Sequence, residues 1–173
     1  IGTSTIVGTI AVSTGTYNAD GEFDATGGNV TFTDAGALVL SNTVTDLGTF
    51  IKGTSTVTYD EADAQAVDNV DYHHLVISGG ATKTLGGTTN VGGDLTVTAT
   101  GTILDVNTRT LDVNGTSAIS SSGKVTISTG TYDADGIMNC TASLEFTDAG
   151  SLNLSNTVTD LGTFIKGTST VTY

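Results

Sequence analysis

Four oxygen-bearing side chains alternate along one short segment near the start of the chain. Asn18, Asp20, Glu22 and Asp24 occupy every second position around the turn dipeptide Asp20-Gly21. Carboxylate and amide oxygens are the ligands that Ca²⁺ takes in proteins. These four side chains are therefore candidate ligands of a calcium ion. The alternative is an Asx-rich turn without a metal, because Asp and Asn side chains also hydrogen-bond to nearby backbone.

The most acidic stretch runs from Asp60 to Asp71 and is followed by His73 and His74. Such a charge cluster is typical of a solvated loop, and the loop could also present carboxylates to a ligand. Histidines beside a carboxylate can ligate a transition metal. Neighbouring residues of a strand point to opposite faces, however, so we do not expect the two histidines to share one ion.

The residues do not supply the groups that common enzyme mechanisms require. The only cysteine, Cys140, aligns with Ala25 of a related segment, which indicates a small, half-buried position and not a nucleophile. Both histidines lie in one dipeptide, so no Ser-His-Asp set is evident. A glycan-cleaving site needs paired carboxylates in a groove, yet the chain has one arginine, Arg109, and no tryptophan to grip a sugar. We predict that the protein is not an enzyme.

Composition excludes further classes of function and favours strands. The 173 residues include 18 Asp or Glu and only 5 Lys or Arg, a formal net charge of −13. Nucleic acid is therefore not an expected partner, because its binding needs clustered cations. No apolar run is long enough to span a membrane, and no cofactor beyond the calcium ion is indicated. With 36 Thr, 23 Gly and no Pro, the chain favours extended structure.

The chain contains a long internal repeat. The twenty residues from Leu40 to Tyr59 recur letter for letter from Leu154 to Tyr173, an offset of 114 residues. Looser similarity extends this match upstream in both copies. We therefore divide one continuous repeat segment, 1–173, into a first unit, 1–114, and the first half of a second unit, 115–173. The simplest interpretation is a window cut from a longer array of repeats.

Apolar residues recur in pairs that flank one intervening residue, as in Leu75/Ile77 and Leu95/Val97. This period of two predicts strands, and the longer steps between pairs cluster near 19 residues. About 19 extended residues, roughly 60 Å of chain, can wrap once around a narrow core. We predict an all-β fold: a parallel β-solenoid, or right-handed β-helix, with coils of about 18–20 residues. The alternative is a set of antiparallel β-sandwich modules, because Asp-Gly and Asn-Gly dipeptides also favour hairpins.

Two segments of the sequence resemble a known kind of protein. The segment from Leu75 to Val97 follows the pattern LxISGxxTKTLxGxxxVxGDLTV, and Gly15 to Gly28 is similar to GTYDADGxFDATGG. Both patterns resemble the Thr- and Gly-rich tandem repeats of large bacterial or archaeal cell-surface β-helix proteins, of the filamentous-haemagglutinin-like and autotransporter-adhesin-like kind. The resemblance implies display outside the cell, in a structural or adhesive role, and it supplies no catalytic residues. The second copy departs from the pattern at residues 137–139, where Ile and Asn replace Glu22 and Asp24.

These observations lead to one expected function and one alternative. We expect a structural repeat of an extracellular surface protein that forms a stalk, sheath or filament, with neighbouring repeats or other copies of the chain as partners. An unpaired coil is a template for the next one, so assembly would proceed by end-to-end β-stacking. The alternative is an adhesin module that binds a glycan or a protein on the cell surface through acidic loops such as Asp60–Asp71.

Overall fold

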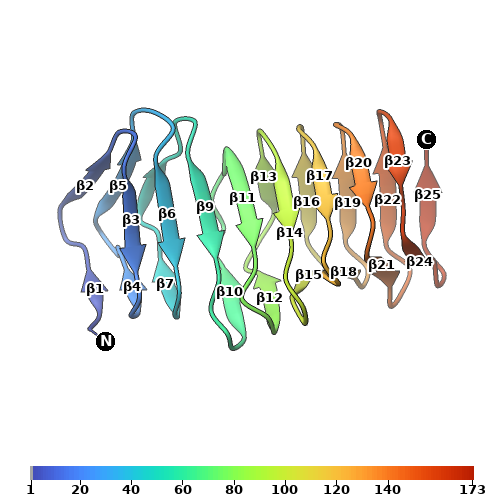
Figure 1. Ribbon diagram of the computed structural model, residues 1–173, viewed down its shortest axis with the longest axis horizontal. Coiled ribbons are helices and arrows are strands. Elements are labelled where there is room, and N and C mark those ends of the chain that lie inside the picture. The colour runs from blue at the N-terminus through green and yellow to red at the C-terminus, as the bar shows by residue number, and fades with distance from the viewer. Residues whose placement is uncertain (1) are drawn as a thin grey trace.

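The computed structural model describes residues 2–173, which form a parallel β-solenoid (Figure 1). The chain winds as a stack of about eight coils around three faces. All strand pairs among the described residues are parallel. The prediction of an all-β parallel solenoid is confirmed, and the antiparallel sandwich alternative is wrong.

The first face is made of two sheets that follow one another along the axis of the solenoid. Its members are β1 (Ser4–Thr5), β4 (Phe23–Asp24), β7 (Val44–Asp46), β10 (Gln65–Val67), β12 (Thr82–Leu85), β15 (Ile103–Asn107), β18 (Lys124–Ile127), β21 (Ser143–Phe146) and β24 (Thr163–Ile165). The strands β7 and β10 are in contact without forming a ladder. Just beyond β7, the Leu47 amide donates a hydrogen bond to the Asp68 carboxylate, 2.7 Å away, which links the two coils.

The second face is also interrupted once. Its members are β2 (Thr9–Val12), β5 (Asn29–Phe32), β8 (Thr49–Ile51), β13 (Thr89–Val91), β16 (Thr110–Val113), β19 (Thr131–Ala134), β22 (Ser151–Leu154) and β25 (Thr170–Thr172). Between β8 and β13 the described residues form an isolated bridge at Tyr72 in place of a strand. Tyr72 forms a parallel bridge to Val91, and its ring lies against Phe50 with the ring centroids 6.0 Å apart.

The third face is one unbroken eight-stranded sheet, and its front strands are clear in Figure 1. Its members are β3 (Thr16–Ala19), β6 (Ala37–Leu40), β9 (Thr56–Tyr59), β11 (His74–Ile77), β14 (Leu95–Val97), β17 (Ser117–Ile119), β20 (Met138–Cys140) and β23 (Val158–Asp160). Each strand lies beside the strand of the next coil, so sequence-distant residues become axial neighbours.

Alternation along each strand sends apolar side chains to a core shared by all coils. Leu75 and Ile77 are fully buried, whereas Val76 between them is partly exposed. The register places Leu75 between Val57 and Leu95, both also fully buried. Burying a side chain of this size contributes about 1.5–3 kcal/mol, and the buried residues form one cluster along the axis.

The coils are slightly more variable in length than predicted. Val57 and Leu75, which are paired, are 18 residues apart, whereas the paired Val91 and Val113 are 22 apart. The predicted range of 18–20 residues is therefore too narrow at its upper limit, because the turns between faces differ in length. None of the described residues forms a helix long and apolar enough to cross a membrane.

Candidate functional site

A shallow groove of about 340 Å³ follows the outer surface of the first face. Six of its seven lining residues have polar side chains, and the lining comes from β12, β15 and β18 and from the turns after β18 and β21: Thr82, Ile103, Asp105, Asn107, Thr126, Ser128 and Thr147. These residues point outward because their strand neighbours, such as Leu104 and Val125, occupy the core.

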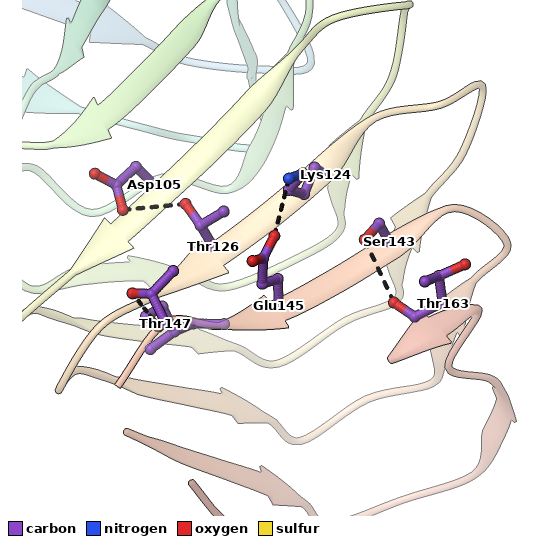
Figure 2. A network of polar contacts seen from close by, with 8 residues as sticks. Asp105, Lys124, Thr126, Ser143, Glu145, Thr147 and Thr163 are labelled. Carbon is purple, nitrogen blue, oxygen red and sulfur yellow. Dashed lines mark hydrogen bonds and ion pairs between the residues drawn. The ribbon is translucent and has the colours of Figure 1, made fainter. Parts of the chain in front are cut away.

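Hydrogen bonds in and beside the groove connect successive coils (Figure 2). The Asp105 carboxylate accepts a hydrogen bond of 3.2 Å from the Thr126 hydroxyl of the next coil. The Lys124 ammonium lies 2.9 Å from Glu145 of the coil after that, and both side chains of this ion pair are partly exposed. These pairs satisfy the polar groups within the protein and bind each coil to the next.

The two carboxylates of this surface stand in one axial row. Asp105 pairs in register with Thr126, which pairs with Glu145, so Asp105 and Glu145 are two coils apart, about 9.6 Å at the usual strand spacing. Asp105 also accepts the Asn107 amide at 3.0 Å. Because both carboxylates already have partners in the protein, the arrangement favours structural cross-links. The prediction that the protein is not an enzyme stays a prediction.

The structure divides the four predicted calcium ligands between the third and first faces. Asn18 lies on β3, Asp24 lies on β4, and Asp20 and Glu22 lie in the exposed turn between them. Glu22 accepts the Thr45 hydroxyl at 2.8 Å. Asp24 accepts the Thr26 amide at 2.9 Å, and hydrogen bonds from Thr26 lower the pKa of this carboxyl.

Within residues 2–173 no group of three or more His, Cys, Asp or Glu side chains is arranged to hold a metal ion. The calcium hypothesis for this turn stays a prediction. The bond from the Thr26 amide to Asp24 is a local side chain–backbone bond of the kind the alternative expects, whereas Glu22 bonds to a side chain of the next coil.

The acidic stretch 60–71 is anchored to the solenoid by a buried lysine. Lys83 is fully buried on β12, and its ammonium donates hydrogen bonds to the carbonyls of Glu61 (2.6 Å), Asp63 (3.0 Å) and Gly80 (2.6 Å). Three acceptors match the three donors of an ammonium group. Burial lowers the pKa of Lys83, while the nearby carboxylates, Glu61 foremost, oppose that effect.

A closed set of hydrogen bonds holds the other end of this stretch. The hydroxyls of Tyr59 and Tyr72 lie 2.8 Å apart in the core. Tyr72 donates to the Asp68 carbonyl at 2.8 Å, so Tyr59 donates to Tyr72, and the Asp68 amide donates back to Tyr59 at 3.1 Å. Burial raises the pKa of both tyrosines. The acidic stretch is therefore an ordered corner of the fold, and Asp63 and Asp71 are exposed on its surface.

The two histidines lie closer together than strand alternation predicts. Their ring centroids are 4.3 Å apart, because β11 begins at His74 and His73 lies in the turn before it. The expectation that the rings point to opposite faces is wrong. His74 Nδ1 accepts the Asp94 amide at 2.9 Å, and burial, with a smaller effect of His74 and Lys52, lowers the pKa of His73.

The lone cysteine is deeper in the protein than the sequence indicates. Cys140 on β20 is fully buried, and burial raises the pKa of its thiol. The equivalent Ala25 is also fully buried. A buried thiol of raised pKa has little thiolate character at neutral pH, which makes it a poor nucleophile.

A row of outward Asn and Asp residues on the second face was not apparent from the sequence. Outward residues of β13, β16, β19 and β22 align as Asn90, Asp112, Asp133 and Asn153. The Asp112 Oδ1 atom is buried and has no hydrogen-bond partner among the described residues. Burial first, then the charges of Asp135 and Asp133, raise the pKa of Asp112.

Sequence reasoning missed Lys83 as well, although a signal was available. Lys83 precedes Leu85 by two positions, and period-two alternation places both on the inward side of β12. Lysine is almost never fully buried without partners, so an inward lysine would have indicated a carbonyl cage nearby.

Comparisons with protein-family models, with curated proteins and with solved structures find no match.

We predict that Lys83→Met destabilises the protein strongly. Methionine fills the space but leaves three carbonyls without donors, and an unsatisfied buried acceptor costs about 1–3 kcal/mol. Urea unfolding followed by circular dichroism measures the loss. The matched control is Lys124→Met, which removes a half-exposed ion pair worth about 0–1 kcal/mol. Equal stability of the two variants would contradict a structural role for the buried ammonium.

We also predict that Asp112→Asn stabilises the protein increasingly as pH rises. A carboxyl with a raised folded-state pKa contributes stability below its unfolded pKa of about 3.9, and this contribution disappears as pH rises through the folded value. Asparagine does not titrate, so the advantage of the variant should grow between pH 3 and 7 in thermal unfolding. Asp71→Asn, at an exposed position, changes the net charge equally. The same pH trend in both variants would show that the effect comes from net charge and not from the surroundings of the Asp112 carboxyl.

Proposed function

We propose that this chain is a structural repeat segment of an extracellular surface protein, in which stacked coils build a stalk, sheath or filament. In this proposal coils join end to end by β-stacking, either to neighbouring repeats of the same chain or to another copy. The extracellular setting follows from the resemblance of the Leu75–Val97 and Gly15–Gly28 segments to cell-surface repeats.

The supporting observation is that one sequence occurs in two environments. Residues 40–59 and 154–173 are identical, yet Tyr59 is fully buried and Tyr173 is 82% exposed. Val57 is likewise fully buried, whereas Val171 is partly exposed. In the described chain the coil that carries β11 covers the first copy, and the second copy forms the last described coil. The last coil thus presents an apolar surface that a coil of this type fits.

The interior copy indicates what would cover this surface. There, β9 pairs in parallel with β11 of the following coil, and Tyr72 of that coil packs against Tyr59 with the ring centroids 6.3 Å apart. A coil equivalent to residues 60–77 therefore supplies both the backbone hydrogen bonds and the apolar contacts. Exposed strand edges readily pair with other strands in this way.

Charge supports growth along the axis over association from the side. The net charge of −13 is carried by outward side chains and turns, whereas the ends of the stack expose backbone edges and core residues. Like charges repel neighbouring solenoids laterally at low salt. An elongated, unbundled rod is the expected product.

This proposal predicts that one inward charge on the last coil blocks end-to-end association. Val171→Lys places an ammonium in the apolar end surface, where pairing with a further coil would bury it without a partner. The matched control is Thr172→Lys, on the same strand but pointing outward. Electron microscopy and sedimentation should show rods for the parent chain and the control, and single particles for Val171→Lys. Compact particles from the parent chain would refute the filament proposal, and rods of equal length from all three would refute axial stacking at this surface.

An adhesive role is the second candidate. The carboxylates of Asp63 and Asp71 are exposed, unlike those of Asp60 and Asp68, which bind neighbouring coils. A second groove, of about 250 Å³ and lined in part by Ala64, Gln65 and Thr82, lies beside this corner.

The adhesive role predicts that the double variant Asp63→Ala/Asp71→Ala loses glycan binding on an array to which the parent chain binds. The control is Asp34→Ala/Asp148→Ala, which removes two exposed acids from equivalent turns of the two copies. No binding by the parent chain, or equal loss in both double variants, would rule out the acidic corner as the binding site.

A further inference from the structure

The two copies of the repeat do not occupy the same faces of the solenoid. The segment Thr-Phe-Ile forms β8 on the second face in the first copy and β24 on the first face in the second copy. Ile51 and Ile165, which are equivalent, are 53% and 45% exposed on these different faces. Likewise β3, with Tyr17, lies on the third face, whereas its equivalent β19, with Tyr132, lies on the second.

The change of face is the same for all matched strands. Strands β3, β6 and β9 of the third face correspond to β19, β22 and β25 of the second; β2, β5 and β8 of the second correspond to β18, β21 and β24 of the first; and β4 and β7 of the first correspond to β20 and β23 of the third. Each copy is therefore turned as a whole by one face.

The number of strand positions in the repeat unit explains why the second copy is rotated by one face. From β8 to β24 there are sixteen steps in strand number, and the bridge at Tyr72 adds one position without a strand, so equivalent positions are seventeen apart. Each coil has three positions, and seventeen is one short of six coils. The 114-residue unit thus advances five and two-thirds coils.

Local structure tolerates this rotation because two different corners of the solenoid accept the same bend. Asp46 accepts the Gly48 amide in the first copy, and Asp160 accepts the Gly162 amide in the second. The two glycines have φ values of 66° and 57°, a left-handed conformation that glycine adopts without strain. The sequence fixes the bend, and the strand count fixes the face on which it lies.

We propose that tandem copies of this unit form a three-sided screw, in which each surface group appears on the three faces in turn. At about 4.8 Å per coil, copies follow one another every 27 Å or so along the axis and return to the same face after about 82 Å. Each surface group of the unit is therefore repeated in three axial rows, one on each face of the rod, and a partner that recognises this group can bind on any of the three faces. The acidic groups are distributed over all sides in the same way, so no side of the rod is left neutral.

The display of surface groups on three faces of a rod rests on the proposed structural role. The rotation of one copy relative to the other is a property of the isolated chain and can be tested there. Spin labels at cysteines measure it by double electron–electron resonance, in a Cys140→Ala background that copies the residue of the first repeat. The pair Asn18→Cys/Asn139→Cys lies on one row of the third face, six coils apart by register. The pair Asn18→Cys/Asp133→Cys joins repeat-equivalent positions on different faces.

We expect a distance near 29 Å between backbone positions for residues 18 and 139, from six steps of about 4.8 Å, and a longer distance for residues 18 and 133, because they lie across the solenoid. If the unit spanned a whole number of coils, residue 133 would stand in line with residue 18 and the order of the two distances would reverse. That reversed order would overturn the screw. Failure to form rods would leave this result unchanged, so the two proposals can fail separately.

Discussion

The hydrogen bonds between the backbones of successive coils are the interaction on which the rest of the structure depends. His74 donates its amide to Ser55 of the coil before at 3.0 Å, and Leu75 donates to Asp94 of the coil after at 3.0 Å. This ladder sets the spacing of the coils and aligns like side chains into rows. It also requires an amide at each interior strand position, which agrees with a chain that has no proline.

The ladder brings equivalent positions of successive coils within a few ångström of one another. The side chains of each row must therefore be able to lie next to one another without a steric or electrostatic conflict. Apolar rows such as Val57, Leu75 and Leu95 meet this condition by packing. The polar row from Asp105 to Glu145 meets it by alternating with Thr126 and by the ion pair to Lys124. The row at Asp112 meets it poorly, since two carboxylates are adjacent there and one oxygen has no partner. Ladder geometry thus explains both the stable surfaces of the solenoid and its strained one.

The fold could be predicted because its strongest signal, apolar pairs at period two, is local. Pairs such as Leu95/Val97 identify strands without knowledge of their neighbours. Strands that lack such a pair, among them β4 (Phe23–Asp24) and β10 (Gln65–Val67), cannot be recognised in this way. The rotation of one repeat copy by one face relative to the other could not be predicted for the same reason. It becomes evident only when every strand position is counted, including the single bridge at Tyr72.

The candidate sites were predicted less well, because they depend on contacts across coils. The role of Lys83 rests on carbonyls 20 and 22 residues earlier in the chain. The acidic stretch was expected to be a solvated loop, and its outer residues are exposed, but Tyr59 and Tyr72 fix it from inside. No sequence pattern shows such contacts until the register of the coils is known.

The most direct test of the stacked-coil account is a set of nuclear Overhauser contacts between backbone protons. The account predicts contacts that join residues 18–22 positions apart and advance in the same direction along both strands, for example Leu75 with Val57 and Ile77 with Tyr59. Contacts that advance along one strand while they retreat along its neighbour would demonstrate antiparallel pairing, and such a result would contradict the parallel winding and every proposal built on it.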